Sequence, residues 1–320
     1  MSDDDTPTLP AIATRLTRFG VVEVDGDDAT EFLQNQLTND VHLATPEQGQ
    51  LQAWLNPKGR ALTTFWLLVP EPGRYWLIMP RERIAATMKR LTMFVLRSRV
   101  TLADHSEAFA LFGLRGAEPL QRATALLGRL PKPDWGCVTA GPHTAIALPQ
   151  PAGLLLLSPQ HHSAATATTL AIGGDSDEQG WWLGLVRAGL PVVTEATSEA
   201  FVPQMLNWER IGGVSFKKGC YPGQEVVARM HYLGKPKRRT FRLASGGPCP
   251  AEGSTVTLAD DTGNAAGQVV NAAPTPEGGC ELLAVLKLDA RGSGAALADS
   301  DGRPLQPQAL PYALDDPEGD

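Results

Sequence analysis

The C-terminal part of the chain, from about Arg239 onward, has the pattern that constrains the fold most. Short runs of β-forming residues alternate there with glycine, proline and aspartate turns, at a spacing of roughly a dozen residues. Many short strands at even spacing are typical of a small antiparallel barrel or sandwich. The sequence therefore predicts such a domain, with strands at residues 240–243, 255–258, 268–270 and 281–288.

The residues before this region mix strand and helix patterns. Amphipathic or apolar periodicity predicts helices at residues 84–95, 118–127 and 159–170, and strands at 20–25, 61–69, 74–79, 108–112, 144–148 and 154–157. Asp28 and Glu31 have the spacing of a capping box, which predicts a helix start at Asp28. No regular strand–helix–strand rhythm is present, so α+β is favoured over a doubly wound sheet. With 320 residues, two or three domains are expected, and Lys235-Pro236-Lys237 is the predicted junction.

The charge distribution is uneven along the chain. The 28 Lys and Arg against 35 Asp and Glu give a net charge of −7, which excludes a generally polybasic nucleic-acid binder. Residues 217–242 nevertheless contain eight cations and a single acid, Glu225, so this segment carries +7 and the remainder −14. Two interpretations stay open: an anionic ligand binds nearby, or these cations pair with acidic side chains elsewhere.

Cysteine usage and hydropathy bear on the compartment. Cys137, Cys220, Cys249 and Cys280 stand singly, with no C-x-x-C pair and no histidine cluster. We therefore expect no disulfide scaffold, no metal site and a reducing compartment. The apolar runs are shorter than the ~20 residues that span a bilayer, and residues 1–10 are acidic, unlike a signal peptide. The sequence predicts a soluble, cytoplasmic protein with no membrane partner.

The most distinctive stretch is residues 217–225, which read K-K-G-C-Y-P-G-Q-E. Pro222-Gly223 has the residue types of a type II turn, and Gly219 gives the backbone before Cys220 unusual freedom. Two lysines beside a thiol favour its thiolate form. Cys220 is thus either a reactive thiol or a small buried turn residue. Of the others, Cys137 and Cys280 are predicted to be inert core thiols, and Cys249 to be exposed.

Several segments together resemble one family. They are residues 32–41 (F-L-Q-N-Q-L-T-N-D-V), 56–60 (N-P-K-G-R), 188–191 (A-G-L-P), 201–204 (F-V-P-Q), and 212–225 with the exit segment 233–235. In these blocks the chain resembles the YgfZ family, folate-binding relatives of the glycine-cleavage T-protein that are linked to iron–sulfur protein maturation and tRNA modification. The resemblance implies two interlocked α+β subdomains over residues 1–236, a β-barrel over 237–314 and an acidic tail at 315–320. It also implies a ring-like arrangement with tetrahydrofolate, or a related reduced folate, in a central cavity.

The resemblance assigns binding residues by position. The folate-stacking aromatics match Phe19 and Trp181, or Trp182 if the alignment slips by one residue. Flat pterin and benzoyl rings need aromatic or apolar walls, and an anionic glutamate tail needs cations. We expect the remaining binding residues to be Tyr221, the cations Lys217, Lys218, Lys235 and Arg238, and Arg187, which stands where T-protein has a pterin-contacting glutamate.

Two departures from T-protein argue against aminomethyl transfer. Thr63 and Thr64 replace a pair of aspartates, and a hydroxyl cannot accept a proton as a carboxylate does near neutral pH. The favoured hypothesis is a folate-binding accessory protein without classical enzyme activity. It would support assembly or repair of iron–sulfur clusters, and through cluster enzymes tRNA modification, with Cys220 as the functional thiol. The alternatives are a tRNA-binding modification factor that uses residues 217–242, and a folate-dependent one-carbon transferase.

Overall fold

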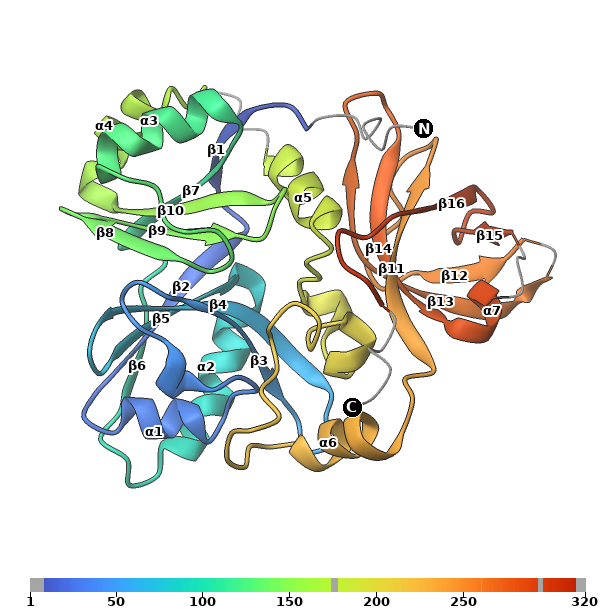
Figure 1. The fold of residues 1–320 in the computed structure, drawn as a ribbon, viewed down its shortest axis with the longest axis horizontal. Helices are drawn as coiled ribbons and strands as arrows, with labels where there is room; N and C mark the ends of the chain where they lie inside the picture. The colour runs from blue at the N-terminus through green and yellow to red at the C-terminus, as the bar shows by residue number, and fades with distance from the viewer. Residues whose placement is uncertain (1–8, 174–177, 260, 293–295, 315–320) are drawn as a thin grey trace.

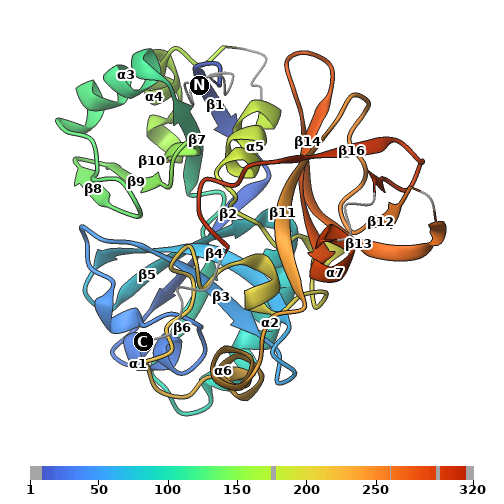
Figure 2. The ribbon, with the colours of Figure 1, turned by 45° about the vertical axis from the view of Figure 1, so that its right-hand side comes forward.

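The computed structural model describes residues 9–173, 178–259, 261–292 and 296–314; residues 1–8 and the predicted tail at 315–320 lie outside this part. Two antiparallel five-stranded sheets and a closed six-stranded barrel are arranged around a common centre (Figures 1 and 2). The fold is thus mixed α+β with a C-terminal barrel, as the sequence predicts. Within the described residues, no helix is both long and apolar enough to cross a membrane.

The first sheet lies between two cores because its strands alternate. In β2, Val22 and Val24 face a core shared with two helices, whereas Phe19 and Val21 face the centre of the molecule. The strand order is β3 (Gln50–Leu55), β4 (Ala61–Glu71), β5 (Arg74–Pro80), β2 (Phe19–Asp25) and β6 (Thr101–Asp104), and the helices are α1 (Ala29–Gln34) and α2 (Arg81–Val95).

The second sheet interlocks with the first through the course of the chain. Its edge strand β1 (Ile12–Leu16) pairs with β7 (Phe109–Arg115), yet every strand of the first sheet lies between these two in sequence. This gives the interlocked subdomains that the resemblance implies. The remaining elements of this subdomain are β10 (Gly153–Pro159), β9 (His143–Leu148), β8 (Cys137–Ala140), α3 (Ala117–Leu127), η2 (Gln160–His162) and α4 (Ser163–Leu170).

Helix α5 (Glu178–Arg187) connects the sheets to the barrel and packs on β1, β13 and β14 (Figure 1). An extended segment with short turns then leads to α6 (Gln224–Leu233), which precedes the barrel. The short turns of this segment are η3 (Glu195–Thr197) and η4 (Pro203–Leu206), whereas η1 (Val41–Leu43) lies between α1 and β3. The barrel order is β11 (Arg238–Ser245), β14 (Cys280–Lys287), β13 (Asp261–Pro274), β12 (Thr255–Leu258), β15 (Leu297–Ala298) and β16 (Pro304–Gln308), with α7 (Leu288–Gly292) after β14.

The predicted capping box at Asp28 is wrong. Asp28 does occupy the N-cap position of α1, but its side chain makes no capping hydrogen bond. Its carboxylate instead accepts hydrogen bonds from the backbone N–H of Arg99 at 2.8 Å and from the Arg99 guanidinium at 3.3 Å. These bonds lower the pKa of Asp28. The Asp28 carboxylate therefore binds Arg99, which is distant in sequence, instead of capping α1.

Candidate functional site

The segments that carry the family resemblance meet in space. Thr38 donates a hydrogen bond from its hydroxyl to the carbonyl of Gly213 at 2.8 Å, and its own carbonyl accepts one from the N–H of Ser215 at 2.9 Å. The Asn39 amide donates to the carbonyl of Gly212 at 2.7 Å. Residues 212–215 thus lie along residues 38–39, although more than 170 positions separate them in sequence.

Buried Lys218 stabilises the contact between residues 212–215 and residues 38–39. Its ammonium group donates to the carbonyls of Gln34, Leu37 and Asn39 at 2.6, 2.6 and 3.0 Å. The residue is only 8% exposed, and burial lowers its pKa to about 8. Its Nζ also lies 5.2 Å from the ring centre of Tyr221. Lys218 therefore ties the cysteine-bearing segment to the end of α1, and its charge is engaged with these carbonyls.

The turn after the cysteine is held by close backbone contact. Gly223 has φ 81° and ψ 0°, the values of the third residue of the predicted type II turn. A Cβ at Gly223 would lie 2.5 Å from the carbonyl oxygen of Asn56 and 2.7 Å from Gly59 Cα. The role predicted for Gly219 is wrong, because its φ is not in the left-handed region and a Cβ there would meet open space.

The two free thiols differ in their surroundings. Cys220 is exposed, in the loop just before α6, with exposed Lys217 three positions earlier. Cys137 is buried, and burial raises its pKa to about 12, as expected of an inert core thiol. A reagent in solution thus reaches Cys220 far more readily than Cys137. Among the described residues, no group of three or more His, Cys, Asp or Glu side chains is placed to hold a metal ion.

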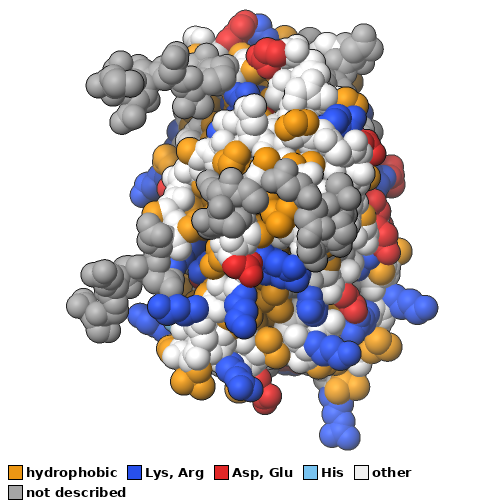
Figure 3. Space-filling model, turned by 90° about the vertical axis from the view of Figure 1, so that its right-hand side faces the viewer, with side chains coloured by type: hydrophobic (Ala, Val, Ile, Leu, Met, Phe, Trp, Pro, Cys, Tyr) orange, Lys and Arg blue, Asp and Glu red, His pale blue; other side chains and the backbone are white. Residues whose placement is uncertain are grey.

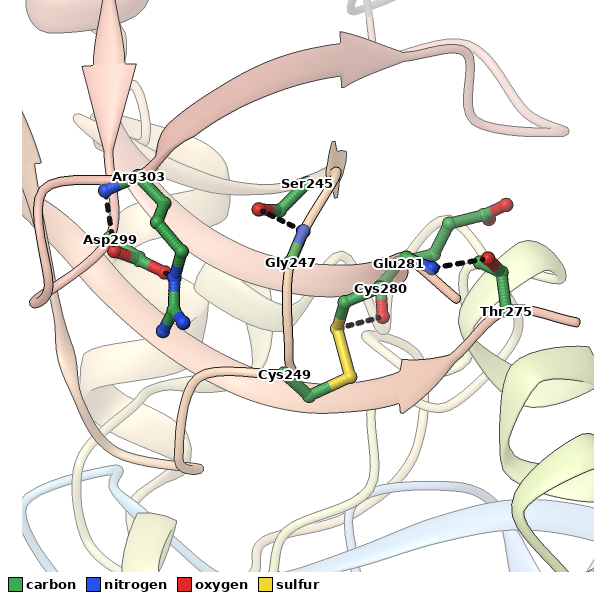
Figure 4. Close-up of a disulfide and its surroundings, with 9 residues drawn as sticks. Ser245, Gly247, Cys249, Thr275, Cys280, Glu281, Asp299 and Arg303 are labelled. Atoms are coloured by element: carbon green, nitrogen blue, oxygen red, sulfur yellow. Dashed lines mark hydrogen bonds and ion pairs between the residues drawn. A yellow bond between two sulfur atoms is a disulfide. The ribbon is translucent and has the colours of Figure 1, made fainter. Parts of the chain in front are cut away.

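The remaining cysteines form a disulfide, which corrects the expectation of separate thiols. Cys249 and Cys280 join the loop after β11 to the start of β14, with Cα atoms 5.1 Å apart (Figure 4). The 31-residue separation gave no sign of this pairing, because only the antiparallel pairing of β11 with β14 brings the two positions together. Neither the inert thiol predicted for Cys280 nor the exposed thiol predicted for Cys249 exists in this structure. The cysteine argument for a reducing compartment loses its basis as well.

Aromatic rings gather at the centre of the molecule. Phe19 stacks on Trp182 with ring centres 5.2 Å apart and an interplanar angle of 18°, and it lies 5.1 Å from Trp66. The Arg18 guanidinium lies 4.2 Å above the Trp182 ring. Trp181 points elsewhere and packs against Gly113, where a Cβ would lie 2.5 Å from the indole. Of the two alternatives that the resemblance left open, Trp182 is therefore the partner of Phe19.

Phe19 and Trp66 form part of the wall of an apolar cavity. The centre of a water molecule can occupy about 10 Å³ of this cavity, which is roughly the room for one water. Thr64 lies in this wall, but its hydroxyl accepts a hydrogen bond from the N–H of Val193 at 2.9 Å. None of the lining residues is charged; they are Phe19, Leu51, Thr64, Phe65, Trp66, Ile78, Pro80, Leu190, Pro191, Val192 and Ile211. The cavity thus offers flat apolar walls and no acid or base.

The predicted cationic residues lie away from this wall. Lys217, Lys235 and Arg238 are exposed around α6 and the start of β11. Arg187 is buried in a bidentate ion pair with Glu281 of β14, in which Nη2 donates to Oε1 at 2.7 Å and Nε donates to Oε2 at 3.2 Å. The charge reversal at position 187 is therefore balanced by a carboxylate from the barrel. The assignment of these cations to a ligand remains a prediction.

Sequence reasoning missed two participants of the central region. Trp66 is two positions from Thr64 in β4, so the period-2 rule for strands could have placed it on the same face. No sequence pattern predicted the ion pair of Glu281 with Arg187, because it forms only where the barrel packs against α5.

Comparisons with known proteins agree with this architecture. The family described as GCVT N-terminal domain matches residues 12–135. The chain is 30% identical to the tRNA-modifying protein YgfZ of Edwardsiella ictaluri over 97% of this chain and 95% of the relative. It is also 30% identical to the protein of that name from Colwellia psychrerythraea, over 93% and 92%. Its fold is similar to the glycine cleavage system aminomethyltransferase T from Bartonella henselae, with a TM-score of 0.75, 19% identity, and coverage of 95% of this chain and 86% of that one. The chain belongs to the YgfZ family.

Proposed function

We propose that this protein binds a reduced folate in the central cavity and acts as an accessory factor for tRNA modification, through support of iron–sulfur cluster enzymes. The rings of Phe19 and Trp66 in the cavity wall carry the folate part of the proposal, since they supply flat surfaces for a pterin or benzoyl ring, and Trp182 supports Phe19 by stacking on it. The names of the relatives, tRNA-modifying protein YgfZ, support the link to tRNA modification.

The fit of a folate can be tested against these walls. Phe19 and Trp66 offer two aromatic surfaces in the wall, and Trp182 stacks on Phe19 without lining the cavity itself. The cavity has no charged lining residue, which suits the aromatic part of the molecule and leaves the glutamate tail to the outside. Because so little space is open to a water molecule, we expect the walls to separate when a folate enters.

Two threonines at the centre of the molecule argue against folate-dependent one-carbon transfer. Thr63 and Thr64 are buried, and the Thr64 hydroxyl is engaged with the backbone of Val193. Transfer of a one-carbon unit needs a general base near the pterin, and the cavity wall offers none. We therefore expect no formation of methylene-tetrahydrofolate.

Cys220 is our candidate for the residue that supports iron–sulfur cluster enzymes. It is exposed and lies in a loop that Lys218 and Gly223 hold in place. A single thiol cannot hold a cluster that takes four ligands, but it can supply one ligand to a cluster in transit. This role places iron–sulfur proteins or their assembly machinery among the partners.

The two halves need separate experiments. Titration of the purified protein with tetrahydrofolate should quench its tryptophan fluorescence, and Trp182→Leu should weaken binding at least tenfold, with Trp135→Phe as the control. Absence of a saturable response up to millimolar ligand would rule out the folate site. In cells that lack the protein, Cys220→Ala should fail to restore cluster-dependent enzymes and thiolated tRNA nucleosides, whereas Cys137→Ala should restore them. Full rescue by Cys220→Ala would rule out the role of the thiol.

A further inference from the structure

Helix α6 carries two exposed aromatic side chains, His231 and Tyr232, beside half-buried Phe216 of the preceding segment. Phe216 stacks face to face on His231, with ring centres 3.7 Å apart and an interplanar angle of 10°. Tyr232 meets His231 edge to face at 4.7 Å and is 65% exposed. Phe216 is anchored because its other contacts are with the central core. The group therefore presents a fixed aromatic surface to solvent, at the cost of leaving apolar area in water.

Five exposed cations lie close to these rings in the sequence. Lys217 follows Phe216, Arg229 lies one helical turn before Tyr232, and the others follow the helix; the five are Lys217, Arg229, Lys235, Lys237 and Arg238. All are exposed, and within the described part of the chain none of them forms an ion pair, whereas Arg239 pairs with Glu209. With Glu225 as the only acid of α6 and its flanks, the surface carries a charge of +4. The alternative that this whole basic segment pairs with acidic side chains elsewhere is wrong for these five residues.

The space-filling view shows where basic side chains gather on one face of the molecule. Figure 3 shows Lys and Arg side chains gathered over the lower half of the barrel-side face, with few acidic ones among them. Figure 1 places α6 at the lower end of the molecule, and the two views differ only by a turn about the vertical axis. The protein as a whole carries −7, so this concentration is a local feature of the surface.

We infer that the surface formed by Phe216, His231, Tyr232 and the five cations binds single-stranded RNA, with an unpaired base stacked on the exposed aromatic group. Exposed rings among unpaired cations are what single-stranded nucleic acid requires, because the cations neutralise phosphates and the rings stack with bases. A duplex would leave the rings unused, since its bases are already stacked. An acidic peptide would use the charges but would not need Tyr232.

This inference goes beyond the proposed function, which requires no contact between the protein and RNA. The protein would then contact RNA directly, in addition to any role of the Cys220 thiol. Cys220 lies four positions before the first residue of α6, and a helix of 10 residues is about 15 Å long. An RNA loop on the aromatic surface would therefore lie within roughly two helix lengths of Cys220.

The first test uses a fluorescein-labelled, 12-nucleotide single-stranded RNA of mixed sequence and measures anisotropy with the full-length protein. Tyr232→Leu removes the ring but keeps an apolar side chain at an exposed helix position, so folding should be unaffected. We expect it to raise the Kd about tenfold, since loss of one base stack is of that order. Tyr232→Phe keeps the ring and should stay within twofold of the unaltered protein.

The second test measures the salt dependence of Kd. Arg229→Gln with Lys237→Gln should reduce the slope of log Kd against log salt by about 1.4, at ~0.7 for each lost phosphate contact of a single strand. Lys89→Gln with Arg97→Gln changes the net charge equally on α2 and just after it, and should leave the slope unchanged. Tetrahydrofolate titrations of the same variants should match the unaltered protein, so that loss of RNA binding and loss of folate binding are measured separately.

Three results would overturn the inference. One is no change of anisotropy up to about 50 µM protein at low salt. Another is equal affinity of Tyr232→Leu and Tyr232→Phe, which would assign the binding to charge alone. The third is stronger binding to duplex RNA or to vesicles containing phosphatidylglycerol than to the single strand, since exposed Leu233 and Val226 could insert into a lipid surface.

Discussion

Replacement of Lys218 by methionine tests whether the cysteine-bearing loop is built as described. Methionine keeps an unbranched side chain of similar length but removes three hydrogen bonds, from Nζ to the carbonyls of Gln34, Leu37 and Asn39. Each hydrogen bond to a charged group contributes about 1.5–3 kcal/mol, so the gross loss is roughly 5–9 kcal/mol. The folded variant no longer has to bury an ammonium group, and this offsets several kcal/mol of the loss. We expect the free energy of unfolding to fall by about 3–5 kcal/mol, which is the gross loss less the recovered desolvation cost.

Lys217→Met provides the matched control. It makes the same chemical change one position earlier, at an exposed side chain, and should alter the free energy of unfolding by no more than about 0.5 kcal/mol. Urea titrations followed by tryptophan fluorescence would give both values. Hydrogen exchange should become faster at residues 34–39 and 212–220 in Lys218→Met only. A loss below about 1 kcal/mol relative to Lys217→Met, with unchanged exchange, would refute the view that Lys218 holds this loop.

Three other predictions follow from the same structure. Because Lys218 has a pKa of about 8 when folded and 10.5 as its ordinary value, the unfolded chain binds more protons between these values. The free energy of unfolding, relative to that of Lys218→Met, should therefore rise by roughly 2 kcal/mol between about pH 7 and about pH 9.5. A difference between the two proteins that does not change with pH would contradict this. Gly223→Ala should destabilise the protein by about 2 kcal/mol or more in urea titrations because of its positive φ and the contact with Asn56, while Gly219→Ala should have little effect. Cys280→Ser should cost about 3–4 kcal/mol, as expected of a loop with a 31-residue separation, and reductant should lower the unaltered protein to the same value.

Local periodicity predicted most elements correctly, and long-range contacts account for the errors. The amphipathic pattern with Ile84 and Leu91 predicted α2, and the short apolar runs after Arg239 predicted the barrel, because both patterns report which face of an element is buried. The turn at Gly223 was likewise predictable from its residue types. By contrast, Asp28 pairs with Arg99, 71 positions away, and no local pattern reports such a partner.

The site was only partly predictable for the same reason. The family resemblance predicted the segments and the aromatic residues, Phe19 with Trp181 or Trp182, and the residue types of the 217–225 stretch predicted Cys220 as the functional thiol. The sequence could not show that Lys218 is engaged with three carbonyls, since Gln34 to Asn39 precede it by about 180 positions. The disulfide between Cys249 and Cys280 depends on barrel pairing in a similar way.

The cavity and the thiol are connected by a single segment of chain, which bears on how the two parts of the proposed function work together. Ile211 lines the cavity, and Gly212 and Gly213, which follow it, accept hydrogen bonds from the side chains of Asn39 and Thr38. Since the closed cavity has little free volume, a folate that enters must displace wall residues, and displacement of Ile211 would act on the segment that ends at Cys220. We expect saturating tetrahydrofolate to change the alkylation rate of Cys220 at least twofold, and to have no such effect in Trp182→Leu at the same concentration. An unchanged rate in the folate-saturated protein would mean that the cavity and the thiol work independently.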